Sequence, residues 1–245
     1  MGVYSSKLAR EVRLERMRPG QIAEATARRA AVYVPFGSIE WHGRQNAVGL
    51  DAIKAHEQLV GLADRAGGVV YPPVFFGSGG GHGGYPHSYM LEAEQLAPLV
   101  TGLLHHFERD RFEAAILLSG HYPNRREYLD AAVDAYRQAG GSMRVLAIVE
   151  NEAPGVSGDH AAFWETSYMM HLHPETVDVS QLAGRDDDRT GPDEQRNWMG
   201  EEFTGHPCYG LLGADPRGNA SAEAGREADE RLIEHLVRWL DGTAG

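Results

Sequence analysis

Short apolar runs alternate with helix-like segments through the first 150 residues, and this alternation constrains the fold more than any other feature. The apolar runs predict four strands, at residues 31–34, 69–76, 114–118 and 144–149. Helical patterns predict helices at residues 21–29, 51–66, 91–108 and 124–139. Strands that alternate with helices form a mostly parallel sheet covered by helices on both faces. We therefore predict an α/β fold.

Prolines follow one predicted strand and interrupt another. We expect Pro35 and Gly37 to end the first strand, and Pro72 and Pro73 to make the second an edge strand or an irregular one. After residue 150 the pattern changes, and it predicts a helix at 161–171, a long polar loop at 181–218 and a final amphipathic helix at 222–240. The sequence contains no internal repeat and no convincing linker, so we expect a single domain over residues 1–245.

The charge and the cysteine content exclude several classes of protein. The 245 residues carry a formal net charge of −12, with an isoelectric point near 5.4, and such a surface repels phosphate backbones. Cys208 is the single cysteine, so no intrachain disulfide forms. The sequence has no signal-peptide pattern and no long apolar run. We expect a cytoplasmic protein that binds neither nucleic acid nor membranes.

Two carboxylates and an imidazole follow the first predicted strand. Glu40 and His42 are two residues apart, so in an extended segment both side chains point to the same side, and Asp51 begins the next helix. Anionic oxygens together with a neutral nitrogen suit a divalent metal such as zinc, manganese or iron. The alternative is a polar loop in which Glu40 caps a helix and His42 is merely hydrogen-bonded.

Other candidate residues also follow strand ends. His82 lies in the glycine-rich segment 77–88, and His121 follows the strand predicted at 114–118. Ligands of open α/β sheets bind at the carboxyl ends of the strands, which favours a site shared by these histidines, Glu40 and His42. The glycine-rich segment lacks the Lys-Ser/Thr ending of a phosphate-binding loop, so we do not predict a nucleotide site there.

Five pieces of sequence, in order and with matching spacing between about residues 20 and 175, resemble the creatininase (creatinine amidohydrolase) family. They are Gly37-Ser38-Ile39-Glu40-Trp41-His42-Gly43, Gly120-His121, Asn124, Gly158-Asp159-His160 and Phe163-Trp164-Glu165-Thr166-Ser167. The most specific piece is Glu-x-His followed nine residues later by Asp. The resemblance implies a metal-dependent hydrolase with a three-layer α/β/α fold around a mostly parallel sheet, often assembled as a hexamer.

The resemblance also implies roles for single residues. The expected metal ligands are Glu40, His42, Asp51, His121 and Glu165, with Asp51 as the bridge if two ions bind. His160 is expected to move protons at the reacting carbonyl, and Glu165 to bind the metal or orient the attacking water. We expect His160 to lie before the predicted helix that carries Glu165, so that both face the metal. The expected substrate contacts are Ser78, His82, His87 and Tyr122.

Departures from the family pattern concern the second metal and the substrate. Creatininase has a glutamate, which helps to hold a second metal, where this chain has Pro123, and a tryptophan that closes over the substrate where it has Val156. The segments Arg44-Gln45-Asn46-Ala47 and Tyr85-Pro86-His87-Ser88 also differ. We therefore expect one tight metal site and an uncertain second one, and a substrate other than creatinine.

The leading functional hypothesis is hydrolysis of a small cyclic amide or a related carbonyl compound by metal-activated water. The resemblance leaves other bonds open, because relatives include a deformylase, a peptidase and a hydrolase of a C–C bond in a keto-inositol. A non-catalytic metal-binding oligomer is a further alternative. We expect a homo-oligomer, a hexamer by resemblance, in which the polar segment 181–218 reaches a neighbour's pocket.

Overall fold

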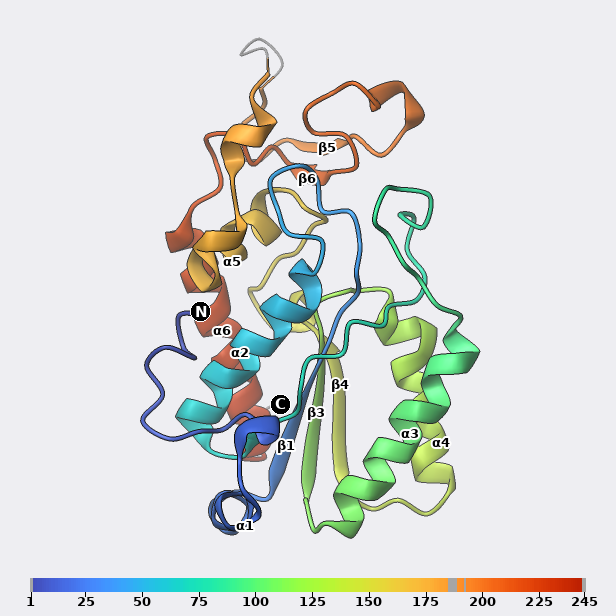
Figure 1. Ribbon diagram of the computed structural model, residues 1–245, viewed down its shortest axis with the longest axis vertical. Helices are drawn as coiled ribbons and strands as arrows, with labels where there is room; N and C mark the ends of the chain where they lie inside the picture. The colour runs from blue at the N-terminus through green and yellow to red at the C-terminus, as the bar shows by residue number, and fades with distance from the viewer. Residues whose placement is uncertain (1, 185–188, 192, 244–245) are drawn as a thin grey trace.

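A four-stranded parallel sheet lies at the centre of the computed structural model, which describes residues 2–184, 189–191 and 193–243 (Figure 1). The strands are adjacent in the order β2–β1–β3–β4, and every neighbouring pair is parallel. Their bounds are β1 Ala31–Phe36, β2 Val69–Val70, β3 Ala114–Ser119 and β4 Arg144–Val149. The predicted mostly parallel sheet is confirmed.

Pro35 does not end the first strand, contrary to the prediction. It lies within β1 and is paired with Leu118 of β3. The carbonyl groups of Tyr33 and Pro35 accept hydrogen bonds from Tyr71 and Val74, which come from the β2 side. The missing N–H of Pro35 faces that same side, where β2 has already ended. The proline therefore costs the ladder between β1 and β3 nothing.

The second strand is shorter than predicted. β2 covers only Val69 and Val70, and it lies at the edge of the sheet, as its two prolines indicated. Beyond Val70 the chain keeps contact with β1 only through single bonds, such as the 2.9 Å bond from Val74 N to the Pro35 carbonyl. Pro72 and Pro73 have no N–H to donate, so a regular ladder cannot continue through them.

Helices cover both faces of the sheet, which gives three layers (Figure 1). One face is covered by α2 Leu50–Ala66, α5 Phe163–Leu172 and α6 Ala222–Leu240. The other face is covered by α3 Ala93–Arg109 and α4 Asp130–Gln138, which a π-helical turn at Arg125–Leu129 precedes. Side chains of β1 alternate between the two cores: Tyr33 packs into the first, and Val32 and Val34 into the second.

The remaining elements are short, apart from α1. They are α1 Pro19–Arg28, the strands β5 Gln195–Asn197 and β6 Leu212–Ala214, and 3-10 turns at Leu14–Arg16, Glu150–Glu152, Pro174–Thr176, Val179–Leu182 and Glu201–Phe203. β5 and β6 pair antiparallel inside the segment predicted as a polar loop. Figure 1 places this pair at the upper end of the sheet, above β3 and β4.

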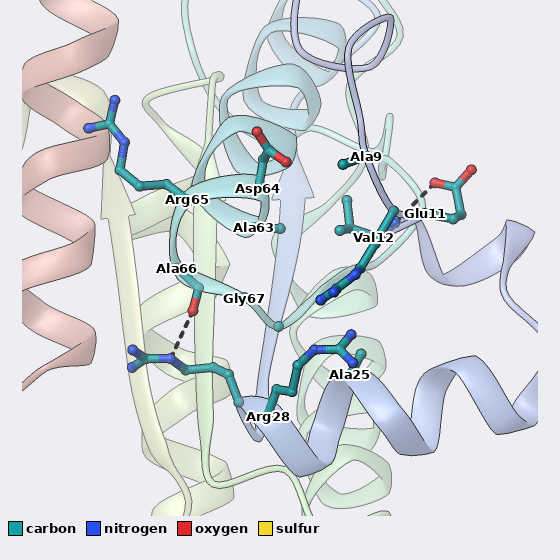
Figure 2. A pocket seen from close by; sticks show the side chains of 13 residues that line it. Ala9, Glu11, Val12, Ala25, Arg28, Ala63, Asp64, Arg65, Ala66 and Gly67 are labelled. Carbon is teal, nitrogen blue, oxygen red and sulfur yellow. Dashed lines mark hydrogen bonds between the residues drawn. The ribbon is translucent and has the colours of Figure 1, made fainter.

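A cavity that is separate from these strand ends lies at the amino end of the sheet. It measures about 460 Å³ and is lined by residues 9–12 and by the C-terminal turns of α1 and α2 (Figure 2). Arg28 and Asp64 border it, and Arg29 Nε donates to the Ala66 carbonyl at its edge. Its lining contains the carboxylates of Glu11 and Asp64 but no histidine, so it lacks the imidazole that the predicted metal site needs. Within the described ranges, no helix has the length and apolar character that a membrane span needs.

Candidate metal centre

Two glycines allow the start of α2 to approach the strand ends closely. A Cβ on Gly37, just after β1, would lie 2.2 Å from the backbone nitrogen of Ala52, and one on Gly120, just after β3, would lie 2.2 Å from the Asp51 carbonyl oxygen. Real Cβ atoms do not tolerate such distances from backbone. Glycine at both positions therefore lets Asp51 sit against the carboxyl ends of β1 and β3.

A first group of side chains forms around Glu40, Asp51 and His121, all of which are buried. His121 Nδ1 lies 2.8 Å from Glu40 Oε2 and 3.4 Å from Asp51 Oδ2. Ser38 fixes the two carboxylates, because its Oγ lies 2.6 Å from Asp51 Oδ2 and 3.1 Å from Glu40 Oε2. The structure thus brings together three of the residues predicted as ligands.

The second oxygen of Asp51 faces a different group. Oδ1 lies 3.0 Å from His42 Nε2, and His42 Nε2 lies 3.7 Å from Glu165 Oε2. His42, His160 and Glu165 also offer ligand atoms within 4.8 Å of one another. Asp51 therefore lies between two sets of donor atoms, with one carboxylate oxygen toward each.

The backbone contacts of the two histidines are compatible with a metal ion at these donor sets. His42 Nδ1 is 3.0 Å from the Glu40 carbonyl, and His121 Nε2 is 3.2 Å from the Ser78 carbonyl. A carbonyl only accepts, so each of these nitrogens carries the proton in the neutral ring. The other nitrogen then presents a lone pair to a carboxylate oxygen, and two acceptors approach this closely only with a proton or a cation between them. Backbone-anchored imidazoles of this kind are typical of metal ligands.

The pKa shifts of these side chains also indicate that the cluster binds positive charge. Burial alone would lower the pKa of His42, but the charge of Asp51 and their hydrogen bond raise it to about 9. Burial would likewise lower the pKa of His121, but hydrogen bonds to Asp51 and Glu40 raise it to about 10. Burial would raise the pKa of Asp51, but the neighbouring histidines hold it well below its usual value. The carboxylates therefore stay ionised and require cations beside them.

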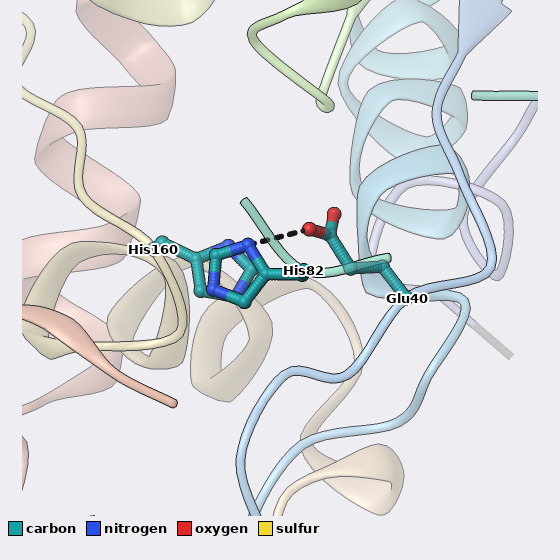
Figure 3. Close-up of side chains that lie close together, drawn as sticks. All are labelled: Glu40, His82 and His160. Atoms are coloured by element: carbon teal, nitrogen blue, oxygen red, sulfur yellow. Dashed lines mark ion pairs between the residues drawn. The ribbon is translucent and has the colours of Figure 1, made fainter. Parts of the chain in front are cut away.

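His82, in the glycine-rich segment, contacts the carboxylate of Glu40. Figure 3 shows His82 pointing toward the Glu40 carboxylate, with the ring of His160 stacked against it. His82 Nδ1 lies 2.9 Å from Glu40 Oε1, and the ring centroids of His82 and His160 are 3.7 Å apart. Glu40, His82 and His160 also form a possible ligand group. His82, predicted as a substrate contact, thus also touches a predicted metal ligand.

His160 precedes α5, as predicted, and is held by the backbone. Its Nε2 donates to the Trp41 carbonyl at 2.9 Å, which leaves Nδ1 unprotonated in the neutral ring. Burial, together with the neighbouring His42, holds the pKa of His160 well below its usual value, so the ring is neutral. The next residue, Ala161, has φ of 54°, a left-handed conformation that side chains other than glycine rarely adopt. The unprotonated Nδ1 is the atom at which this ring can accept a proton, and the lowered pKa makes it a weak base in this environment.

Asp159 anchors the start of α5 below His160. Its carboxylate accepts hydrogen bonds from the backbone N–H groups of Trp164 and Glu165, at 2.7 and 3.1 Å. These are donors that a helix leaves without an internal partner at its N-terminus. Burial and the charge of Glu165 raise the pKa of Asp159 to about 7. The cap fixes the backbone from which Glu165 reaches the donor groups.

A cavity of about 250 Å³ adjoins these groups. Its lining residues are Glu40, Asp51, Gly81, His82, Gly120, His121, Tyr122, Pro123, Asp159, His160, Glu165, Met199 and Leu212. Tyr122, predicted as a substrate contact, lines this cavity. Ser78 does not line it and contributes its carbonyl to His121 instead, and His87 is exposed and also lies outside it.

The sequence did not point to several residues that build this site. Met199 and Leu212 lie in a polar segment without periodicity, so no pattern marked them. Lys54 is fully buried and lies 2.9 Å from both Glu150 and Glu165. One signal was available: Lys7 and Lys54 are the only lysines among 23 basic residues, and Lys54 lies one helical turn after Asp51, on the same face of α2.

Comparison with known protein families assigns the chain. The family model for creatininase, described as creatinine amidohydrolase, matches residues 15–240. The chain belongs to the creatininase family. Among curated members, it is 25% identical over 186 residues to the creatinine amidohydrolase of Pseudomonas putida, a match that covers 66% of this chain and 71% of the relative. It is 30% identical over 159 residues to the mycofactocin precursor peptide peptidase of Mycolicibacterium smegmatis, which covers 62% of each chain.

Solved structures of the creatininase family share the fold. A crystal structure of creatinine amidohydrolase superposes with a TM-score of 0.75 at 21% identity, and covers 96% of this chain and 98% of that one. A manganese creatininase gives a TM-score of 0.76 at 21% identity, with 95% and 98% covered. The three-layer α/β/α architecture predicted from the sequence is therefore confirmed.

Proposed function

We propose that this creatininase-family chain is a metal-dependent amidohydrolase that cleaves a C–N bond of a small, uncharged amide, most simply a cyclic one. The observation that carries the proposal is the position of Asp51. One of its oxygens faces Glu40 and His121, and the other faces His42. All four side chains are buried at the carboxyl ends of β1 and β3.

We assign the tighter site to Glu40, Asp51 and His121, and a weaker one to His42, Asp51 and Glu165. The first group has both carboxylates within hydrogen-bonding distance of Ser38, whereas in the second group His42 Nε2 and Glu165 Oε2 are 3.7 Å apart. Zinc and manganese suit this mixed oxygen and nitrogen donor set, and iron does as well. Relatives are described as manganese creatininase and as a Zn–Zn type of a creatininase mutant, which agrees with these metals.

A divalent ion held by Glu40, Asp51 and His121 would lower the pKa of a bound water to about 7 and would polarise a substrate carbonyl. The protein side chains then handle the protons. His160 is neutral and has a free Nδ1, so it can accept a proton from the attacking water and deliver it to the leaving nitrogen. Glu165 Oε2 faces the same space and orients the water. The protein thus adds water across the amide and releases a carboxylate and an amine.

The cavity wall supports an uncharged substrate. None of the described residues that line it is lysine or arginine, so no side chain of these two types is available to pair with a carboxylate or phosphate on the substrate. Val156, at the position of the tryptophan that covers the substrate in creatininase, is packed in the core and does not border the cavity. This arrangement supports a substrate other than creatinine.

Elemental analysis and a substrate panel test the proposal. Protein purified without chelator should contain at least one zinc, manganese or iron ion per chain, and less than about 0.2 ions per chain would contradict a resident metal. The panel should contain lactams, formamides, lactones and keto-inositols, with creatinine as a comparison. Turnover of an amide that EDTA abolishes and Zn²⁺ or Mn²⁺ restores is the expected result.

A peptidase is the second candidate, because 30% identity to a mycofactocin precursor peptide peptidase exceeds the 25% identity to creatinine amidohydrolase. Both reactions hydrolyse a C–N bond, so the same groups serve. Short peptides should therefore be added to the panel. For the assembly, we keep the prediction of a homohexamer, which light scattering at micromolar concentration would test.

A further inference from the structure

Lys54 lies one helical turn after Asp51 on α2 and points into the protein rather than into water. Its side chain is 0% exposed. Its Nζ lies 2.9 Å from a carboxylate oxygen of Glu150 and 2.9 Å from one of Glu165, so the ammonium group is paired with both. A buried charge is retained only where it is paired and hydrogen-bonded. The positions of its two partners, Glu150 and Glu165, therefore indicate the role of Lys54.

One partner, Glu165, belongs to the proposed metal centre. Lys54 Nζ lies 2.9 Å from Glu165 Oε1 and donates a hydrogen bond to it. The other oxygen, Oε2, accepts from the Ala161 N–H at 2.7 Å and lies 3.7 Å from His42 Nε2. Both oxygens are thus fixed from outside the site, and Oε2 is the one presented to His42.

The other partner, Glu150, lies at the end of β4 and away from the donor groups. Its Oε2 lies 2.9 Å from Lys54 Nζ and accepts from the Tyr122 hydroxyl at 3.1 Å. The ammonium group also lies 5.4 Å from the ring centroid of Tyr122 and 5.5 Å from that of Tyr168. Lys54 is therefore fixed by Glu150 and two aromatic rings, and its ammonium group in turn fixes Glu165.

We propose that Lys54 is a positioning residue of the metal centre: by holding Glu165 Oε1 it directs Oε2 toward His42, and it thereby completes the second metal site. This inference rests on the proposed metal-dependent function. Besides Asp51, Glu165 is the carboxylate that lies near His42 at this site, and the geometry of Glu165 depends on Lys54. A residue that orients a ligand in this way typically changes metal affinity by about 10–100-fold.

Two variants separate positioning from simple charge balance. Lys54→Met alone leaves two buried carboxylates without a cation and can prevent folding. The double variant Lys54→Met/Glu150→Gln removes one positive and one negative charge, so the net charge of the cluster is kept. Glu150→Gln alone is the matched control, because Lys54 and Glu165 remain in contact in it.

The experiment is a Co²⁺ titration of chelator-treated protein, followed by visible absorption, which reports the number and geometry of ligands. Wild type and Glu150→Gln should bind the same number of Co²⁺ ions with the same spectrum. The double variant should keep a thermal midpoint near that of Glu150→Gln, but should bind one equivalent about 10–100-fold more weakly, with a changed spectrum. Equal affinity and an unchanged spectrum in the double variant would overturn the positioning role.

A second pair of variants tests the same proposal if the first double variant does not fold. Glu165→Gln should weaken the same equivalent, and Lys54→Met/Glu165→Gln should be no weaker, because Lys54 acts through Glu165. A further loss in that double variant contradicts the proposal. Wild-type protein that binds no Co²⁺ would refute the metal centre itself, and is thus distinguishable from failure of the Lys54 inference alone.

Discussion

Ser38 donates its hydroxyl hydrogen to Asp51 Oδ2 across a distance of 2.6 Å, deep in the protein and just beyond the end of β1. The same hydroxyl lies 3.1 Å from Glu40 Oε2. One short side chain thus fixes carboxylates from two separate segments. Metal ligands that are oriented by such hydrogen bonds bind more tightly, because less freedom is lost when the ion enters.

Replacement of Ser38 should therefore weaken the metal without unfolding the protein. We expect Ser38→Ala to lower the affinity for Zn²⁺ by about 10-fold, as measured by competition with a chromophoric chelator. Ser6→Ala, at an exposed serine, is the control and should bind as wild type does. Unchanged affinity in Ser38→Ala would show that this hydrogen bond does not orient the ligands.

Replacement of His160 should separate proton transfer from metal binding. His160→Ala should keep its metal content and lower kcat by about 10²–10⁴-fold on whichever panel substrate is turned over, the usual contribution of a positioned acid–base group. His106→Ala, on the exposed side of α3, is the control. If the rate of His160→Ala stayed at the wild-type level, another group would have to move the proton.

Removal of the metal should lower thermal stability, because ions that bind only the folded chain stabilise it. At ion concentrations of about 100 times Kd this linkage amounts to about 2.7 kcal/mol. For a chain of this length, we expect EDTA to lower the Tm by about 5–10 °C, and a slight excess of Zn²⁺ or Mn²⁺ to restore it. Identical melting curves with and without chelator would argue against a resident ion.

A methyl group at Gly120 should displace the start of α2. Its Cβ would lie 2.2 Å from the Asp51 carbonyl oxygen, so Gly120→Ala should destabilise the fold by about 1–3 kcal/mol in urea unfolding and weaken metal binding. Gly102→Ala is a matched control, because nothing lies within 4 Å of its Cβ position on α3. That change should be neutral or stabilising by up to about 1 kcal/mol.

The free energy of unfolding should fall as the pH rises from about 4 to 7, because of the buried carboxyl group of Asp229. This carboxyl lies on α6, accepts from the Tyr4 hydroxyl at 2.5 Å, and has its pKa raised to about 7, chiefly by burial. Burial also lowers the pKa of His171, whose Nε2 is 3.9 Å away, so that ring supplies no charge at pH 7. In the unfolded chain the pKa of an aspartate is about 4, so the folded state binds more protons between about pH 4 and 7.

Asp229→Asn removes this dependence. Wild type should lose up to about 1.4 kcal/mol of stability per pH unit across that window, relative to the variant. Urea unfolding of both proteins from pH 5 to 8 measures the difference, and contributions from the metal centre cancel in it. Asp134→Asn, at an exposed position of α4, should instead follow wild type at every pH. Parallel curves for Asp229→Asn and wild type would contradict the prediction.

Much of the fold was predictable because the apolar periodicity stops at the residues where the helices and strands of the structure end. The predicted strand at 144–149 and the helix at 222–240 match β4 and α6 residue for residue. The errors come from proline, whose effect depends on which side its missing N–H faces. In β1 that side has no neighbouring strand, so Pro35 is tolerated, whereas Pro72 and Pro73 stop β2.

The site was predictable where its residues follow strand ends, and not where tertiary packing decides. Glu40, His42 and His121 meet because the carboxyl ends of parallel strands lie along one edge of the sheet. Lys54 lies on a helix, where lysine usually faces water, so its burial depends on partners that are 96 and 111 residues away. His87 and His82 lie in the same loop, and only the folded loop decides which one turns inward.

The segment that carries β5 and β6 supplies Met199 and Leu212 to a cavity whose reacting groups come from elsewhere in the chain. It is joined to the loop of His160 by two backbone bonds, from His160 N to the Leu212 carbonyl at 2.8 Å and from Leu212 N to the His160 carbonyl at 3.0 Å. Backbone hydrogen bonds of this kind form whichever side chains the two segments carry. Side chains exchanged on this one short ribbon can thus change the shape of the cavity without changing His160 or the residues of the proposed metal centre.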